Sequence, residues 1–211
     1  MRVDTLRSIN WDSNDPASPP PALDGNPQAR KAVLETLEAL SGPERTGAEK
    51  QLVHSLAARS PQLAVEIWNR LDPGAQLERG AMVLKTMAEG PGLQTALDLW
   101  KSSSPPLQAA TLRGLAAGLG ASNPMQGVEL AMSQTDPKLR MESLAVTLSF
   151  WSDRDSSQAA AEMERLLPQL NLPLFQEALK NAGQFTSGAT HHYISTGSQL
   201  KARLAALTPA P

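Results

Sequence analysis

The 211-residue chain contains no cysteine and only eight aromatic side chains. Without cysteine the protein cannot form disulfides, use a thiol nucleophile, or hold zinc or an iron–sulfur cluster through thiolates. The lack of cysteine fits a reducing cytosol and a cysteine-poor periplasm equally, so it does not define the compartment. Few aromatic residues, beside abundant alanine and leucine, favour helices over strands.

The sequence also lacks an excess of basic charge. Its 19 Lys and Arg residues are balanced by 21 Asp and Glu residues, for a net charge of −2. Proteins that bind nucleic acid normally carry a basic stripe that neutralises phosphates. The one close basic pair on a predicted helix, Arg30 and Lys31, is followed within two turns by Glu35 and Glu38. We therefore expect no nucleic-acid partner.

Long apolar runs are missing as well. No run approaches the length that a membrane-spanning helix needs, and the first residues, Met1 to Asp4, lack the apolar core of a secretory signal. The sequence thus predicts no membrane insertion. Localisation stays open between the cytoplasm and, if a signal was removed from the chain, the periplasm.

The chain is predicted to have three parts. Residues 1–26 contain a cluster of prolines and show no helical periodicity, which predicts a proline-rich flexible tail or linker. Residues 27–182 show apolar residues at spacings of three and four, as helices require. Residues 183–211 are expected to be an irregular loop followed by a C-terminal capping helix near 198–207. No segment alternates with a period of two for long enough to predict a strand.

Proline marks an internal repeat. Four prolines follow one another at an almost constant interval, and a further proline extends the series upstream at a slightly shorter one. Because proline is favourable in the first turn of a helix and unfavourable inside one, the series predicts regular helix boundaries. The prolines are Pro73, Pro105, Pro137 and Pro168, preceded by Pro43.

A second column follows the same period. Four short segments share a small residue, an acid two places later and an apolar residue directly after the acid. The small residues are Ala64, Ala96, Gly127 and Ala160. Two columns with one period predict tandem helical hairpins, because connections of two to six residues make neighbouring helices antiparallel. We therefore predict an all-α fold, a superhelical α-solenoid of about five antiparallel helical hairpins.

The repeat resembles the tetratricopeptide family. The segment from Ala64 to Pro73 has that family's small residue, an aromatic residue four places later at Trp68, and Asp-Pro at the boundary; Ala96 and Trp100 repeat the spacing. The period here is about 31–32 instead of 34, and the third and fourth units lack the aromatic residue. The resemblance implies a right-handed superhelix that binds protein or peptide segments and has no intrinsic catalysis.

The acids of the second column are candidate partner-binding residues. If equivalent positions stack, their carboxylates form a ridge that would meet a basic partner segment. The alternative is a solvated helix face in which Glu66 and Arg70 form an i,i+4 pair. The four acids are Glu66, Asp98, Glu129 and Glu162.

Trp68 and Trp100 occupy one phase of the repeat, and apolar neighbours on the same face favour a place in the core over an exposed anchor for a partner.

His191 and His192 are the candidate metal ligands. Adjacent histidines can begin a metal site in the 183–197 loop, but no third local ligand accompanies them. The sequence predicts no catalytic residues and no cofactor.

The function predicted from these patterns is a non-catalytic protein–protein interaction or scaffold module that binds a partner segment along the solenoid surface. Two alternatives stay open. The chain could be an architectural spacer or an oligomerisation element, which a self-complementary apolar patch would favour. It could also carry a metal-dependent activity at the 183–197 loop.

Overall fold

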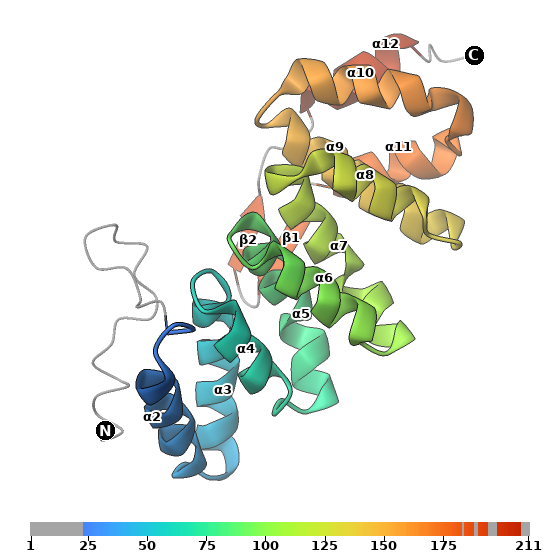
Figure 1. Ribbon diagram of the computed structural model, residues 1–211. Coiled ribbons are helices and arrows are strands. Elements are labelled where there is room, and N and C mark those ends of the chain that lie inside the picture. Colours follow the sequence, from blue (N-terminus) through green and yellow to red (C-terminus); the bar gives the residue numbers. More distant parts are fainter. Residues whose placement is uncertain (1–22, 183, 188–189, 194–197, 208–211) are drawn as a thin grey trace. The chain divides into compact units, whose positions relative to one another are not determined.

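The structure is a computed structural model that describes residues 23–182, 184–187, 190–193 and 198–207 (Figure 1). The described residues are helical almost throughout, with one short antiparallel hairpin near the C-terminus. The predicted all-α class is therefore confirmed. None of the described helices is both long and apolar enough to cross a membrane.

Contacts between residues separate the chain into two units, Met1–Gln108 and Ala109–Pro211. The boundary falls inside one helix, α7 (Pro105–Ser122). The sequence predicts a single array of hairpins. In such an array each hairpin contacts only its neighbours, so the contacts have no common centre. A division into two groups of contacts can then fall within a helix. Each unit is described by itself below.

In the first unit, α3 packs on α4 and α5, and α6 packs on the same two helices α4 and α5. Helix α2 packs against α3, and Figure 1 shows the two side by side in blue. The helices are α2 (Pro27–Glu38), α3 (Gly42–Ala57), α4 (Pro61–Trp68), α5 (Pro73–Glu89) and α6 (Leu93–Ser102).

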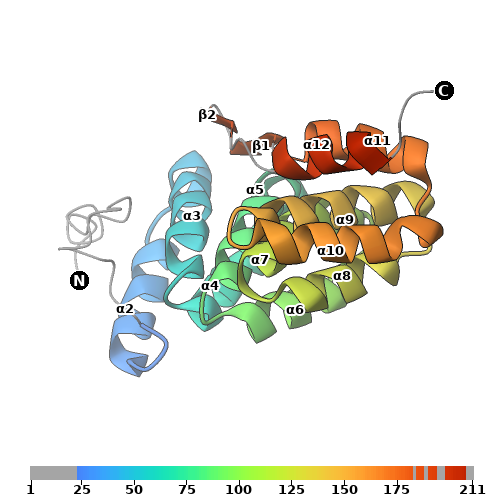
Figure 2. The ribbon, with the colours of Figure 1, turned by 90° about the horizontal axis from the view of Figure 1, so that it is seen from above.

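The second unit is built around α9, which contacts α8, α10, α11 and α12 (Figure 2). Most of α9 from Met141 to Trp151 is buried, whichever way its residues face. A helix that is enclosed all round shows no apolar stripe. The elements are α8 (Pro124–Met132), α9 (Pro137–Ser152), α10 (Ser156–Leu166), the 3₁₀ turn η1 (Leu167–Gln169), α11 (Leu172–Asn181), β1 (Gln184–Ser187), β2 (Thr190–Tyr193) and α12 (Ser198–Leu207).

From α4 to α10, short helices alternate with long ones. The short helices α4, α6, α8 and α10 have 8 to 11 residues and begin at positions 61, 93, 124 and 156. The long helices α5, α7 and α9 have 16 to 18 residues and begin at positions 73, 105 and 137. The helix starts thus follow the period that the sequence shows.

Proline opens most of these helices, where its missing N–H costs no intrahelical hydrogen bond. Pro73, Pro105 and Pro137 begin α5, α7 and α9 as predicted. Pro168 does not begin a long helix, because it lies in η1 and α11 starts only at Leu172. The last repeat therefore has a longer connection between its two helices, α10 and α11, than the repeats before it.

A side chain from each long helix closes the end of the short helix before it. Gln76 Nε2 donates to the Trp68 carbonyl at 3.0 Å, and Gln108 Nε2 donates to the Lys101 carbonyl at 3.0 Å. Arg140 Nε donates to the Gln134 carbonyl at 2.8 Å. Each donor is the fourth residue of its helix, so the three form a column that satisfies carbonyls left free at helix C-termini.

Small residues occupy the fourth position of every short helix, where the backbones come close. Ala64, Ala96 and Ala159 are fully buried there, and Gly127 is buried too. A Cβ on Gly127 would lie 2.7 Å from Cγ2 of Thr147 in α9. Glycine is therefore required for α8 to approach α9 at this distance.

The N-terminal side of the first unit begins earlier than predicted. The Leu23 backbone amide donates to Ser60 Oγ at 2.7 Å, and the Asp24 carboxylate accepts from the amides of Gln62 and Leu63 at 3.0 Å each. Asp24 therefore caps α4 from a distant part of the sequence. Residues 23–26 belong to the helical unit, and residues 1–22 of the predicted tail lie outside the described residues.

The predicted irregular loop contains a hairpin, so that part of the prediction was wrong. Strand β1 pairs antiparallel with β2, with Gln184 opposite Tyr193 and Ser187 opposite Thr190. Strands of four residues are too short for an alternating pattern to be recognised, although phenylalanine, tyrosine and threonine favour strands. The predicted C-terminal helix is present as α12.

Candidate functional site

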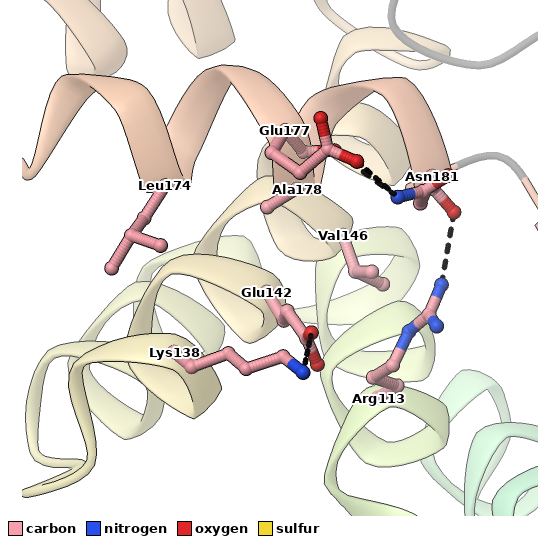
Figure 3. Close-up of a pocket in the computed structure, with 8 residues that line it drawn as sticks. All are labelled: Arg113, Lys138, Glu142, Val146, Leu174, Glu177, Ala178 and Asn181. Carbon is pink, nitrogen blue, oxygen red and sulfur yellow. Dashed lines mark hydrogen bonds and ion pairs between the residues drawn. The ribbon is translucent and has the colours of Figure 1, made fainter.

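A groove of about 310 Å³ lies between helices α9 and α11, with α7 at one end (Figure 3). This volume is at the lower limit of sites that hold a ligand or a side chain of a partner. We call it the α9–α11 groove. Its lining residues are Arg113, Lys138, Glu142, Val146, Leu174, Glu177, Ala178 and Asn181.

Helical spacing brings these side chains to one groove. Lys138, Glu142 and Val146 follow one another at intervals of four along α9, so they lie on one face of that helix. On α11, Leu174 and Ala178 are also four residues apart. Figure 3 shows the two sets on opposite walls of the groove, with Leu174 and Lys138 toward one end and Arg113 with Asn181 at the other.

The two acids that line the groove are each paired with a lysine of their own helix. Lys138 Nζ lies 3.9 Å from Glu142 on the same helix, and Lys180 Nζ lies 3.3 Å from Glu177 on α11. Arg113 Nη2 donates to the carbonyl of Asn181 at 2.9 Å, which satisfies a carbonyl at the end of α11. The groove therefore combines two acids and two bases with an apolar part formed by Val146, Leu174 and Ala178.

Leu174 gives the groove an exposed apolar edge. Its residue surface is 37% exposed, whereas Val146 and Ala178 are buried. An exposed leucine beside paired charges is suited to an apolar side chain of a partner, and the charged rim can then orient the partner. The eight residues of the groove include no serine, threonine, cysteine or histidine, so a Ser–His or Cys–His pair is not found among them.

A second, shallow groove of about 450 Å³ lies along α2 and α4. Six charged side chains line it, and each belongs to an ion pair. Arg30 pairs with Glu66 and Arg70 with Glu38, both between α2 and the α4 segment, while Lys31 pairs with Glu35 within α2. The first two pairs join α2 to α4 and to the turn after it, so the charges of the second groove are used in the packing of the first unit.

The predicted acidic residues are placed in different ways. Glu66 is ion-paired with Arg30, and Asp98 accepts a hydrogen bond from Gln94 at 2.8 Å. Glu129 is exposed on α8. Glu66 and Asp98 belong to the first unit, whereas Glu129 and Glu162 belong to the second. The ridge of four carboxylates remains a prediction.

Glu162 is not equivalent to the other three acids. Glu66, Asp98 and Glu129 are the sixth residues of their helices, whereas Glu162 is the seventh residue of α10. The seventh position lies on the core side, where Ile67 of α4 and Leu99 of α6 are buried and Leu130 of α8 is half-buried. Glu162 is accordingly only 9% exposed. The small residue of its repeat that corresponds to Ala64 and Ala96 is Ala159, not the predicted Ala160.

An arginine accompanies the buried carboxylate. Arg165 Nε and Nη2 donate to the two carboxylate oxygens of Glu162 at 2.8 and 2.6 Å. The hydrogen bonds and the charge of Glu162 raise the pKa of the Arg165 guanidinium above its ordinary value. A two-pronged pair of this kind satisfies a carboxylate at a mostly apolar position.

Two of the three tryptophans among the described residues lie in the core. Trp68 and Trp151 are buried. Trp100 is half-buried, and its indole Nε1 donates to the carbonyl of Gln108 at 3.0 Å. This arrangement agrees with the core placement that the sequence favours for Trp68 and Trp100.

Within the described residues, no three His, Asp or Glu side chains gather closely enough to hold a metal ion. The backbones of His191 and His192 lie in β2, opposite Thr186 and Phe185. Their side chains lie outside the described part of the chain, so the metal-dependent alternative at the 183–197 loop stays untested.

Sequence reasoning missed the α9–α11 groove. The signal that could have indicated it is a second acidic column, because Glu78, Glu142 and Glu177 are the sixth residues of α5, α9 and α11. Two of these acids line the groove. The column was not recognised because the matching positions in α3 and α7 hold Gly47 and Ala110.

Comparison of the chain with protein-family models, with curated proteins and with solved structures found no match.

Proposed function

We propose that this protein is a non-catalytic interaction module whose α9–α11 groove binds a segment of a partner protein. The observation that carries the proposal is the groove itself, in which an exposed leucine and two buried apolar residues lie between charges paired along their own helices. Such a surface can accept one or two apolar side chains of a peptide while its charged rim stays hydrated.

The alternation of short and long helices supports a finer proposal for the architecture. Tandem hairpins of this kind stack into an α-solenoid, and the tetratricopeptide resemblance implies that the superhelix is right-handed. In such an array a partner segment can extend from the α9–α11 groove onto neighbouring helices of the same unit. Within the first unit, Asp98 on α6 is exposed and would remain available to a basic segment.

The proposal is tested by site-specific photocrosslinking in the organism that produces the protein. A photoreactive amino acid is placed at Leu174 in the groove and, in a matched control, at Met125 on α8, which is 48% exposed. The expected result is a discrete adduct with a partner protein from position 174 that position 125 does not give.

A charge reversal checks that the adduct comes from specific binding. Lys138→Glu in the photoreactive protein alters the rim beside Leu174 and should reduce the adduct at least about tenfold, since mismatched charges at an interface cost several kcal/mol. Equal adducts from both positions, or none from position 174, would contradict the proposal.

A further inference from the structure

The C-terminal helix α12 lies against α10 and α9 like a bound peptide. Leu200 and Leu204, four residues apart, are buried, while Lys201, Ala202, Arg203, Ala205 and Ala206 are exposed. Helix α12 contacts α10 and α9, and Figure 2 shows it running alongside α10. Two anchors one turn apart are the pattern of an amphipathic helix bound to a groove.

One ion pair fixes the orientation of α12 on this surface. Arg203 Nε donates to Glu164 Oε1 on α10 at 2.6 Å. The hydrogen bond to Glu164 and the charge of that carboxylate raise the pKa of the Arg203 guanidinium. The surface on α9 and α10 therefore recognises two leucines and one basic residue in the order Leu-x-x-Arg-Leu.

The attachment of α12 differs from that of the other helices in its unit. Helices α8 to α11 follow one another through short connections, whereas residues 182–197, which include the hairpin, separate α11 from α12. A helix of ten residues is not stable alone in water. When α12 leaves its surface it must unfold, so its docking and its folding form one equilibrium that can shift without unfolding α9 and α10.

We propose that the α9–α10 surface beneath α12 is a binding site for an amphipathic helix of another protein, and that α12 is its tethered competitor. The partner helix carries two leucines four residues apart with a basic residue before the second leucine. This site is distinct from the α9–α11 groove and does not depend on the function proposed for that groove.

The tether determines which partner can compete. A segment held by a short linker has an effective concentration in the millimolar range. An identical α12 from a second copy at micromolar concentration would be outcompeted about a thousandfold, so exchange between copies is disfavoured. A successful partner must therefore extend beyond the Leu-x-x-Arg-Leu face and make further contacts on α9 or α10.

Hydrogen exchange on the intact protein tests whether α12 opens by itself. Amides of α12 should exchange at least about a hundredfold faster than those of α9, while the protection of α9 and α10 stays unchanged at early times. If the amides of α12 exchange no faster than those of α9, helix α12 opens only with global unfolding and the proposal is overturned.

Capture of a labelled peptide tests the site directly. The peptide has the sequence of residues 198–207, and the full-length proteins are the wild type and the variant Leu200→Asp/Leu204→Asp. Because the variant's own helix cannot dock, it should bind the peptide at least about tenfold more tightly than the wild type does. A folded variant that binds no better than the wild type overturns the proposal, as does a variant that fails to fold, since α12 would then belong to the core.

A charge exchange separates specific docking from general apolar attachment. The variant Leu200→Asp/Leu204→Asp/Glu164→Arg should lose affinity for the wild-type peptide and regain it for a peptide with Arg203→Glu. If both peptides bind this variant equally, the ion pair does not recognise the helix and the proposed Leu-x-x-Arg-Leu specificity is wrong. Photocrosslinking from Leu174 is unaffected by these changes, so the two proposals can fail independently.

Discussion

A single carboxylate shows how a repeat tolerates an exception. Glu162 occupies a position at which Ile67 of α4 and Leu99 of α6 are buried, and Arg165 binds both of its oxygens. Removing a carboxylate from water is costly, and one exposed arginine offsets that cost only in part. An apolar side chain at position 162 would avoid this cost.

We predict that Glu162→Leu leaves the protein as stable as the wild type or raises its free energy of unfolding by about 1 kcal/mol, since apolar replacement of a buried ion pair is often neutral or stabilising. Arg165 would remain hydrated, because its side chain is 59% exposed. Urea unfolding followed by circular dichroism measures the change. The control Glu162→Ala should destabilise through a cavity, and a loss of stability in the leucine variant would refute the prediction.

The same residue shows why reading the sequence alone placed one column incorrectly. The segment Ala159-Ala160-Ala161 offers three small residues in a row, and nothing local shows which of them faces the neighbouring helix. The burial of Ala159 settles the register. A shift of one residue turns a side chain by about 100° on a helix, enough to move Glu162 from the exposed side to the core side.

At the scale of elements, helix boundaries were predictable because their chemistry is local. Asp72 and Asp136 cap the amides of the helices that they precede, and prolines follow them at the first helical position. The cap that Asp24 provides for α4 was not predictable, because its partners lie far along the chain. The apolar pattern did not indicate the α9–α11 groove either, since the enclosed helix α9 has no apolar stripe to show which face meets α11, and only the column of Glu142 and Glu177 points to it.

An ion pair joins the long helices α3 and α5. Lys50 Nζ donates to Glu78 Oε2 at 2.6 Å, and this hydrogen bond is the largest cause that lowers the pKa of Glu78 below 4.5. Since the folded pKa is lower than that of the unfolded chain, the contribution of Glu78 is complete above about pH 4.5 and is lost as pH falls through the folded value.

We therefore predict that the stability of the wild type falls more steeply below about pH 4.5 than that of Glu78→Gln. Lys50→Met should remove the larger share of this pH dependence by taking away the main donor, while Arg79, which also lowers the pKa of Glu78, keeps the rest. Urea midpoints measured from about pH 6 to about pH 3 provide the comparison. Parallel curves for the wild type and both variants would show that the pair contributes nothing measurable, as many exposed ion pairs do.

At the scale of the whole molecule, the chain resolves into two units whose boundary lies within α7. In arrays of hairpins, stability is the sum of the units and their nearest-neighbour contacts, so damage stays local. The sequence indicates the period and the class of fold, whereas the division into units depends on how contacts are distributed and is not visible in the repeat.

We predict that Trp68→Ala, which removes a buried side chain at a cost of about 3–5 kcal/mol, lowers amide protection in α4 and α5 while α9 keeps its protection. Trp151→Ala in α9 should produce the reverse pattern. Hydrogen exchange with peptide-level resolution distinguishes the two. Equal loss of protection in both units from either substitution would mean that the chain unfolds as one cooperative body.

The column of Gln76, Gln108 and Arg140 has a consequence for the rate of folding. Each side chain donates to a carbonyl only six to eight residues before it in the sequence. Closing so short a loop costs little conformational entropy, so this contact stabilises the turn between the two helices early. Chains dominated by such local contacts fold in microseconds to milliseconds. If the hairpins stack as the proposed solenoid, we expect folding to start at any of these corners, at several points along the chain.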